Sequence, residues 1–109
     1  MLKTLNALAE PNRLRIIELL QNGPRAVGEI VEELGMNQPQ VSKHLRVLVE
    51  AGLLDVEKDA QRHIYKIRPQ PFRELDSWLE SFRQTWDERY DRLDELLREW
   101  QSEDKNQRD

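Results

Sequence analysis

The 109-residue sequence contains no cysteine, so it can form neither a disulfide framework nor a thiolate metal site. It also lacks an apolar run near the roughly 18 residues that a membrane-spanning helix needs. Its first residues do not contain the apolar core of a secretory signal peptide. These absences favour a cytoplasmic protein without a membrane partner, and the length suits one domain with a modest core.

Acidic residues are missing from one stretch of an otherwise acidic chain. The formal net charge is -4, yet no aspartate or glutamate lies between Glu33 and Glu50. Residues 1–70 contain 10 lysines and arginines against 9 acids, whereas residues 71–109 contain 7 against 12. Because binding to phosphate depends on local charge, the overall acidity does not exclude a nucleic-acid partner.

Apolar residues at helical spacing predict two short helices at the start of the chain. The first is expected over residues 2–8. Pro11 suits the first turn of the second, because a helix leaves the first backbone N–H groups without partners. In this second helix we expect Leu14, Ile17 and Leu20 to face the core.

The next two helices form a helix-turn-helix candidate. One is expected over residues 27–34, with Gly35 as its C-terminal stop. After a short turn, Asn37 is the expected N-cap of another helix, with Pro39 in its first turn. The buried stripe of that helix is expected to comprise Val41, Leu45, Leu48 and Val49.

The outward side of this fourth helix contains cations and amides but no acid. At 100° per residue, Lys43, Arg46 and Gln40 point away from the buried stripe. Glutamine amides can pair with adenine edges, and cations can bind guanine or phosphate. We therefore expect Gln38 and Gln40 to read bases while Lys43 and Arg46 anchor phosphates. An ordinary amphipathic helix with a cationic outer face is the alternative.

A β-hairpin is expected next, from two β-prone runs at residues 54–58 and 63–68. A hairpin directly after a helix-turn-helix is a wing. Arg62 and His63, at or just after its tip, are placed to reach a phosphate or the minor groove. The tip has no Asn-Gly or Asp-Gly dipeptide, so its turn type stays open.

The last third of the sequence predicts one long helix with an aromatic stripe. All three tryptophans lie in it, and apolar residues recur at steps of three or four over about eight turns. The small domain cannot cover such a stripe, so a second copy of the chain is the expected partner. A core within one chain, or an aromatic pocket at the dimer interface, are the alternatives. The expected dimer interface comprises Leu5, Leu75, Trp78, Leu79, Phe82, Trp86, Tyr90, Leu93 and Leu97.

Three segments resemble, in this order, the ArsR-type winged helix-turn-helix repressors: ALAEPNRLRIIELL, VGEIVEELGMNQPQVSKHLRVLVEAGLL and RHIYKI. The resemblance covers roughly residues 5–68. It implies a homodimeric transcriptional regulator that binds an inverted repeat at a promoter and usually represses it. It also implies DNA-facing roles for Gln38, Pro39, Ser42 and Lys43, and the role of wing arginine for Arg62.

The sequence departs from the metal-sensing members of that family. Some of them have a cysteine pair on the helix before the recognition helix, where this chain reads EIVEEL. Others use Asp and His ligands on the last helix, but residues 72–101 contain no His. The chain thus resembles a cysteine-free branch of the family, so neither metal nor another cofactor is expected, whereas an unknown small-molecule inducer stays open. The family's usual wing glycine is also absent near Ala60.

These observations predict a mainly α fold with a small β-hairpin wing, in the order α-α-α-α-β-β-α. The DNA-binding domain is expected over residues 1–70, a long dimerisation helix over 71–101 and a disordered tail over 102–109. The expected contacts with double-stranded DNA are Gln38, Pro39, Gln40, Ser42, Lys43, His44, Arg46, Arg62 and His63. A winged-helix module that recruits another protein through its last helix is the alternative function. An enzyme is not expected, because no glycine-rich phosphate loop or Ser/His/Asp arrangement is present.

Overall fold

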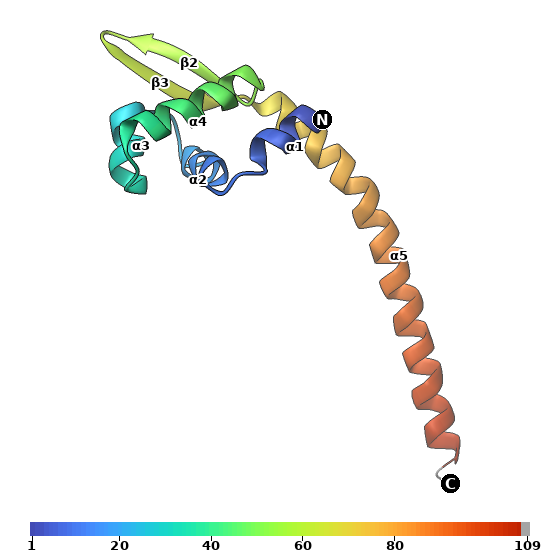
Figure 1. Cartoon of the computed structure of the whole chain (residues 1–109). Helices are drawn as coiled ribbons and strands as arrows, with labels where there is room; N and C mark the ends of the chain where they lie inside the picture. Colours follow the sequence, from blue (N-terminus) through green and yellow to red (C-terminus); the bar gives the residue numbers. More distant parts are fainter. Residues whose placement is uncertain (108–109) are drawn as a thin grey trace. The chain divides into compact units, whose positions relative to one another are not determined.

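The computed structural model describes residues 1–107, and Figure 1 shows their helices and strands. The order of elements is α1 (Leu2–Leu8), α2 (Pro11–Leu20), β1 (Arg25–Ala26), α3 (Val27–Leu34), α4 (Gln38–Glu50), β2 (Leu54–Asp59), β3 (Arg62–Ile67) and α5 (Pro69–Gln107). The expected winged helix-turn-helix is confirmed: α3 and α4 form the helix-turn-helix, and β2 and β3 form the wing. None of these helices has the length and apolar character that crossing a bilayer requires.

The chain divides into two compact units, Met1–Leu75 and the segment from Asp76 onwards. We expected the DNA-binding domain to end at residue 70, whereas the first compact unit extends to Leu75. The reason is Phe72, which is half-buried in the first turns of α5 and packs against the core of the first unit.

The core of the first unit lies where one face of each of α2, α3 and α4 meets the start of β2. Its fully buried side chains are Ile16, Ile30, Val41, Leu45, Leu48, Leu53 and Leu54. At about 25 cal/mol per Å² of apolar surface removed from water, such a cluster is the main term that stabilises the unit.

One expected core residue is wrong. Leu14 is 43% exposed, whereas Ile16 is completely buried beside Ile17 and Leu20. Positions 16, 17 and 20 share one face of α2, and Leu14 lies about 200° around the helix from Ile16. Two of the three expected residues, Ile17 and Leu20, thus lie on the buried face, and Leu14 does not.

Local signals start and stop the helices as expected. The Asn37 side chain accepts a hydrogen bond from the Gln40 N–H at 2.9 Å and so caps α4. Gly35 ends α3 in the left-handed region, with φ of 65°. These two residues set the short turn between the two helices.

The sheet contains a strand that the sequence did not predict. Its order is β1-β3-β2, and β1 pairs antiparallel with β3 through Arg25 opposite Tyr65 and Ala26 opposite Ile64. The observed order is therefore α-α-β-α-α-β-β-α. Two residues are too few to show the alternation on which strand prediction depends.

The wing closes through a two-residue turn. Asp59 pairs with Arg62, which leaves Ala60 and Gln61 at the tip. Ala60 has φ of 57°, and it is the one residue other than glycine with positive φ between residues 1 and 107. A positive φ at the first central position alone is what a type II′ turn requires.

Helix α5 has 39 residues, which corresponds to a length of about 58 Å. We expected a helix that ended near residue 101 and a disordered tail. The structure instead continues the helix to Gln107, and the last two residues of the expected tail lie outside the described residues. Extension of an existing helix costs little where neither Gly nor Pro interrupts it.

Candidate nucleic-acid interface

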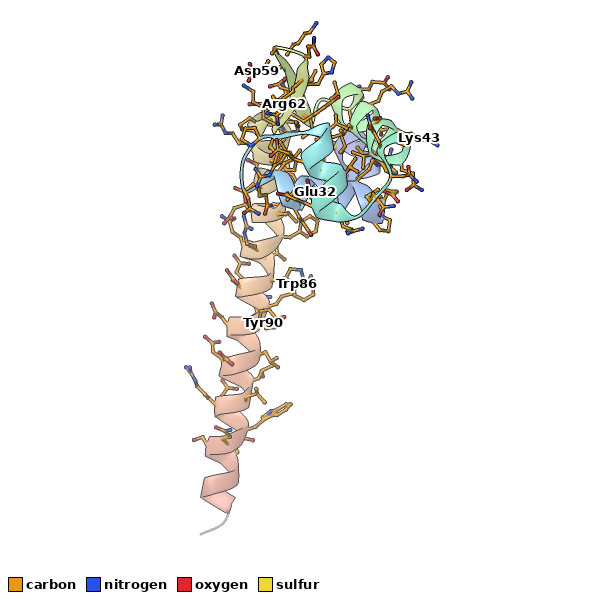
Figure 2. All side chains as sticks on the ribbon, turned by 90° about the vertical axis from the view of Figure 1, so that its left-hand side faces the viewer. Glu32, Lys43, Asp59, Arg62, Trp86 and Tyr90 are labelled. Carbon is orange, nitrogen blue, oxygen red and sulfur yellow. The ribbon has the colours of Figure 1, made fainter. Side chains whose placement is uncertain are left out.

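Burial of one side of α4 fixes which of its residues face solvent. Val41, Leu45 and Leu48 are completely buried. The exposed residues between the start of α4 and Arg46 are Gln38, Pro39, Gln40, Ser42, Lys43 and Arg46. Lys43 projects from this face into solvent (Figure 2). The face combines two amides, a hydroxyl and two cations, and it contains no carboxylate.

His44 lies apart from that exposed group. Its side chain is 16% exposed, and its Nδ1 atom is 3.7 Å from Oε2 of Glu10, the N-cap of α2. The Nδ1 atom is buried without a hydrogen-bond partner. His44 therefore packs toward α2, although we expected it among the DNA contacts. Among the described residues, no group of three His, Asp or Glu side chains could hold a metal ion.

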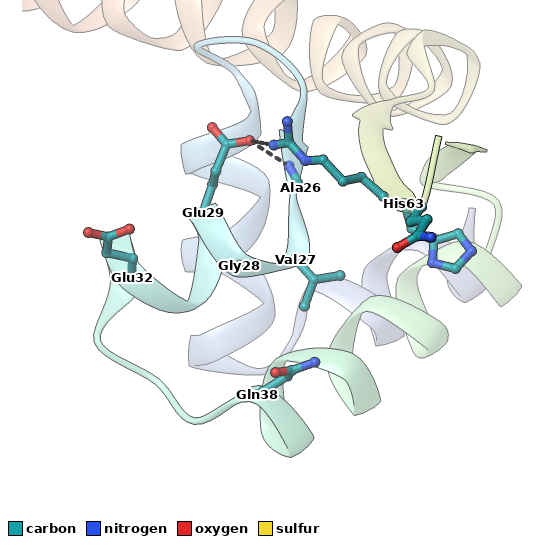
Figure 3. Close-up of a pocket in the computed structure, with 9 residues that line it drawn as sticks. Ala26, Val27, Gly28, Glu29, Glu32, Gln38 and His63 are labelled. Atoms are coloured by element: carbon teal, nitrogen blue, oxygen red, sulfur yellow. Dashed lines mark hydrogen bonds and ion pairs between the residues drawn. The ribbon is translucent and has the colours of Figure 1, made fainter. Parts of the chain in front are cut away.

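The recognition-helix candidate and the wing meet at one hollow of about 540 Å³ (Figure 3). Gln38 from α4 lines it together with Arg62 and His63 from the wing. The start of α3 forms the remaining wall. The hollow thus brings together expected DNA contacts from two elements, α4 and the wing. The complete lining is Ala26, Val27, Gly28, Glu29, Glu32, Gln38, Gln61, Arg62 and His63.

Arg62 is not free at the wing tip. Its Nη2 donates a hydrogen bond to Oε1 of Glu29 at 2.6 Å, an ion pair between β3 and α3. The same Oε1 atom accepts the backbone N–H of Ala26 at 3.2 Å. The sequence did not predict either of these contacts of Glu29. Glu29 lies three residues after Ala26, the N-cap of α3, and this spacing was the local signal for the hydrogen bond to the Ala26 N–H.

A further ion pair lies on the wing between its two strands. Lys66 donates a hydrogen bond to Glu57, and this bond raises the pKa of the Lys66 ammonium above its ordinary value. Arg68 and Asp55 lie 3.5 Å apart nearer the base. These two cations are already matched by acids, so Lys58 and His63 are the exposed basic residues of the wing that have no acid partner among the side chains that the structure describes.

The second unit exposes a stripe of large apolar side chains on α5. Trp86 is 50% and Tyr90 61% exposed, and Figure 2 shows both projecting from the helix. Trp78 and Phe82 form an edge-to-face pair with ring centroids 4.9 Å apart, and the Arg89 guanidinium lies 5.2 Å from the Trp86 ring centre. The exposed stripe, which we call the α5 stripe, comprises Trp78, Leu79, Phe82, Trp86, Tyr90, Leu93, Leu96, Leu97 and Trp100.

Sequence reasoning included most of the α5 stripe in the expected dimer interface but omitted Leu96 and Trp100. Leu5 and Leu75, the other members of that expected interface, are half-buried. Within the second unit the stripe is uncovered, since each of its members is at least 39% exposed. Helix α5 alone therefore provides no core for it.

Known proteins resemble this chain in both sequence and fold. Residues 10–56 match the family described as "Bacterial regulatory protein, arsR family". An HTH-type transcriptional regulator of Mycobacterium tuberculosis is 38% identical over 76 residues, which cover 70% of this chain and 71% of the relative. A probable mercury resistance operon repressor of Streptomyces lividans is 38% identical over 61 residues. That alignment covers 56% of this chain and 49% of the repressor, so the chain spans about half the length of this relative.

A solved structure supports the same assignment. It is the homodimeric winged helix-turn-helix DNA-binding domain of a possible ArsR-family transcriptional regulator from Mycobacterium bovis. The two chains are 30% identical and superpose with a TM-score of 0.63 over 75% of this chain and 76% of the other. The matched segment, residues 10–56, contains the exposed face of α4. The chain belongs to the ArsR family of bacterial transcriptional regulators.

Proposed function

We propose that this protein is a homodimeric, sequence-specific DNA-binding repressor that recognises an inverted repeat at a promoter. The observation that carries the proposal is the exposed face of α4, which presents amides and cations and no acid. A carboxylate on such a face would be repelled by phosphates, whereas the width of an α-helix fits the major groove. The similarity to operon repressors and to a homodimeric DNA-binding domain supports the same function.

In this proposal the two ends of the face have different roles. Gln38 and Gln40 lie in the first turn of α4, and recognition helices direct their N-terminal residues to base edges. A glutamine amide can donate to N7 and accept from N6 of the same adenine. Lys43 and Arg46 lie further along the helix and anchor phosphates, which fixes the position of the helix but does not select sequence. Ser42 lies between these groups on the same exposed side.

The wing supplies a second contact beside the helix. Arg62 and His63 line the hollow that they share with Gln38, so one stretch of backbone can pass between helix and wing. Cations at a wing tip can contact phosphate or enter the minor groove.

The α5 stripe supplies the surface for a second copy of the chain. Large contiguous apolar patches are uncommon on monomeric proteins and mark interaction sites. A single recognition helix reads only a few base pairs. Two helices related by a two-fold axis and about 34 Å apart read successive major grooves of an inverted repeat.

Selection of duplexes from a random pool by the purified full chain tests this proposal. We expect the enriched sequences to contain an inverted repeat and their affinity to fall steeply with salt. Lys43→Ala should weaken binding, whereas Arg73→Ala, which removes an exposed cation from α5, should leave it unchanged. No enrichment, or affinity that is insensitive to salt, would contradict the proposal. A stoichiometric protein partner without DNA affinity would favour the protein-recruiting alternative.

A further inference from the structure

The ion pair between Glu29 and Arg62 joins the start of α3 to the wing. Both residues line the hollow between the wing and the two helices, and dashed lines in Figure 3 mark the two contacts of the Glu29 carboxylate. Arg62 is also the residue that family resemblance and position assign to DNA. In the absence of DNA, the arginine that the proposed function assigns to phosphate is therefore paired with a carboxylate.

Glu29 is fixed in place by its own helix. It is the third residue of α3, and its Oε1 atom accepts the N–H of Ala26 at 3.2 Å, which satisfies a backbone donor that the helix leaves without a partner. The carboxylate therefore cannot follow Arg62 outwards without giving up this hydrogen bond. It stays close to the hollow whichever way the arginine turns.

Arg62 is held more loosely than its partner. Its backbone lies in the last rung of the hairpin, opposite Asp59, and its side chain is 58% exposed. A guanidinium has five N–H donors, and only one donor atom, Nη2, is in contact with Glu29. A phosphate can therefore approach Arg62, but it meets a guanidinium whose charge is already balanced by a carboxylate.

We propose that Glu29 lowers the DNA affinity of this protein by competing with phosphate for Arg62. The inference rests on the proposed DNA-binding function and adds to it an acid that lies outside both the recognition helix and the wing. DNA binding replaces the Glu29–Arg62 pair by an Arg62–phosphate pair and leaves the carboxylate beside the phosphate. Glu29 is thus a positioning residue that acts on DNA through Arg62.

Glu29→Gln provides a clean test, because a Gln at this position still caps the helix through its side-chain oxygen. Exposed ion pairs are weak, so we expect the variant to bind a duplex selected by the wild-type protein between about twofold and fivefold more tightly at low salt. The logarithm of affinity should also fall more steeply with the logarithm of salt, by up to about one unit, because Arg62 then engages a phosphate fully. A purely structural role for Glu29 would not steepen this slope.

Glu32→Gln is the matched control. Glu32 lies three residues further along α3 and lines the same hollow, and its side chain has no hydrogen bond or ion pair within the part of the chain that the structure describes. The substitution Glu32→Gln removes the same charge from the same helix without releasing Arg62, so its effect on DNA affinity should be smaller than that of Glu29→Gln. In an Arg62→Ala background, Glu29→Gln should lose its advantage over the parent and behave as Glu32→Gln does.

Three results would overturn the inference. One is weaker DNA binding by Glu29→Gln at an unchanged thermal unfolding midpoint, which would mean that Glu29 presents Arg62 to DNA. Another is an equal gain for Glu29→Gln and Glu32→Gln, or a gain that persists without Arg62, which would mean a general effect of charge. A wild-type protein that binds no duplex would overturn the proposed function as well, so the two failures are distinguishable.

Discussion

At the tip of the wing, Ala60 adopts φ of 57°, a region that costs a residue with a Cβ atom about 1 to 2 kcal/mol. Glycine avoids this cost but loses more backbone entropy on folding, about 0.5 to 1 kcal/mol. We therefore expect Ala60→Gly to stabilise the protein by up to about 1 kcal/mol and Ala60→Val to destabilise it, because a β-branched residue is the least tolerated there. Urea unfolding measures both. Equal stability of the Gly and Val variants would show that the turn does not need this conformation.

Arg46 is an exposed cation of α4, and within residues 1–107 it has no carboxylate partner. Its proposed contact is therefore with phosphate. Arg46→Ala should weaken binding to all sequences alike and flatten the salt slope by about one unit. Gln38→Ala is the informative comparison, because loss of a base contact should relax selection at one position and leave the slope unchanged. Selective loss at one base position in the Arg46 variant would contradict its role.

The sequence predicted which residues of α4 face outward, but not which distant residues they contact. Helical periodicity is local, so the exposure of Lys43 and Arg46 follows from the spacing of buried Val41, Leu45 and Leu48. The pairing of His44 with Glu10, and of Arg62 with Glu29, joins residues far apart in the sequence. Such pairs depend on how helices and wing pack, which no local pattern reports.

Among the elements, α4 depends on its cap. The side chain of Asn37 accepts the Gln40 N–H at 2.9 Å, and this turn presents the proposed base-reading residues. Asn37→Ala should destabilise the protein by about 1 kcal/mol, because it leaves a helix N–H without its partner. Thermal or urea unfolding measures this loss.

Asn37→Asp separates the role of the cap from the role of charge. Aspartate caps as well as asparagine, and its charge interacts favourably with a helix N-terminus. The variant should therefore keep the stability of the parent. It places an acid at the start of the acid-free stretch, however, so DNA affinity should fall. If Asn37→Asp bound DNA as the parent does, the N-terminus of α4 would not face the duplex.

The predictability of the elements follows from how local their signals are. Pro11, Gly35 and Asn37 each act within one turn of a helix, and the helices begin or end where these residues indicated. Strand β1 has only Arg25 and Ala26, and it exists because β3 lies beside it. Its pairing is a consequence of the fold, so a pattern within two residues could not reveal it.

For the whole molecule, charge and apolar surface are sorted along the chain. The acid-free face lies in the first unit, and the three tryptophans lie in the second. Residues 71–109 contain 12 acids against 7 cations, so this region is poorly suited to bind phosphate. In the proposed function, this separation assigns DNA contacts to the first unit and most of the dimer interface to the second.

The α5 stripe leads to a prediction about the assembled protein. Trp86 lies near its centre, 50% exposed and in contact with Arg89. In a dimer formed through this stripe, loss of a central tryptophan should weaken association by about 2 to 4 kcal/mol, since aromatic side chains near the centre of an interface contribute most. Sedimentation of Trp86→Ala at low micromolar concentration should therefore show monomer where the parent is a dimer.

Gln84→Ala is the matched control, because position 84 lies about 200° around the helix from Trp86, away from the stripe. It should sediment as the parent does. The Trp86 variant should also lose affinity for an inverted repeat while it keeps its weaker affinity for a single half-site, because each recognition helix remains intact. A Trp86→Ala protein that stays as dimeric as the parent would place the interface elsewhere on the molecule.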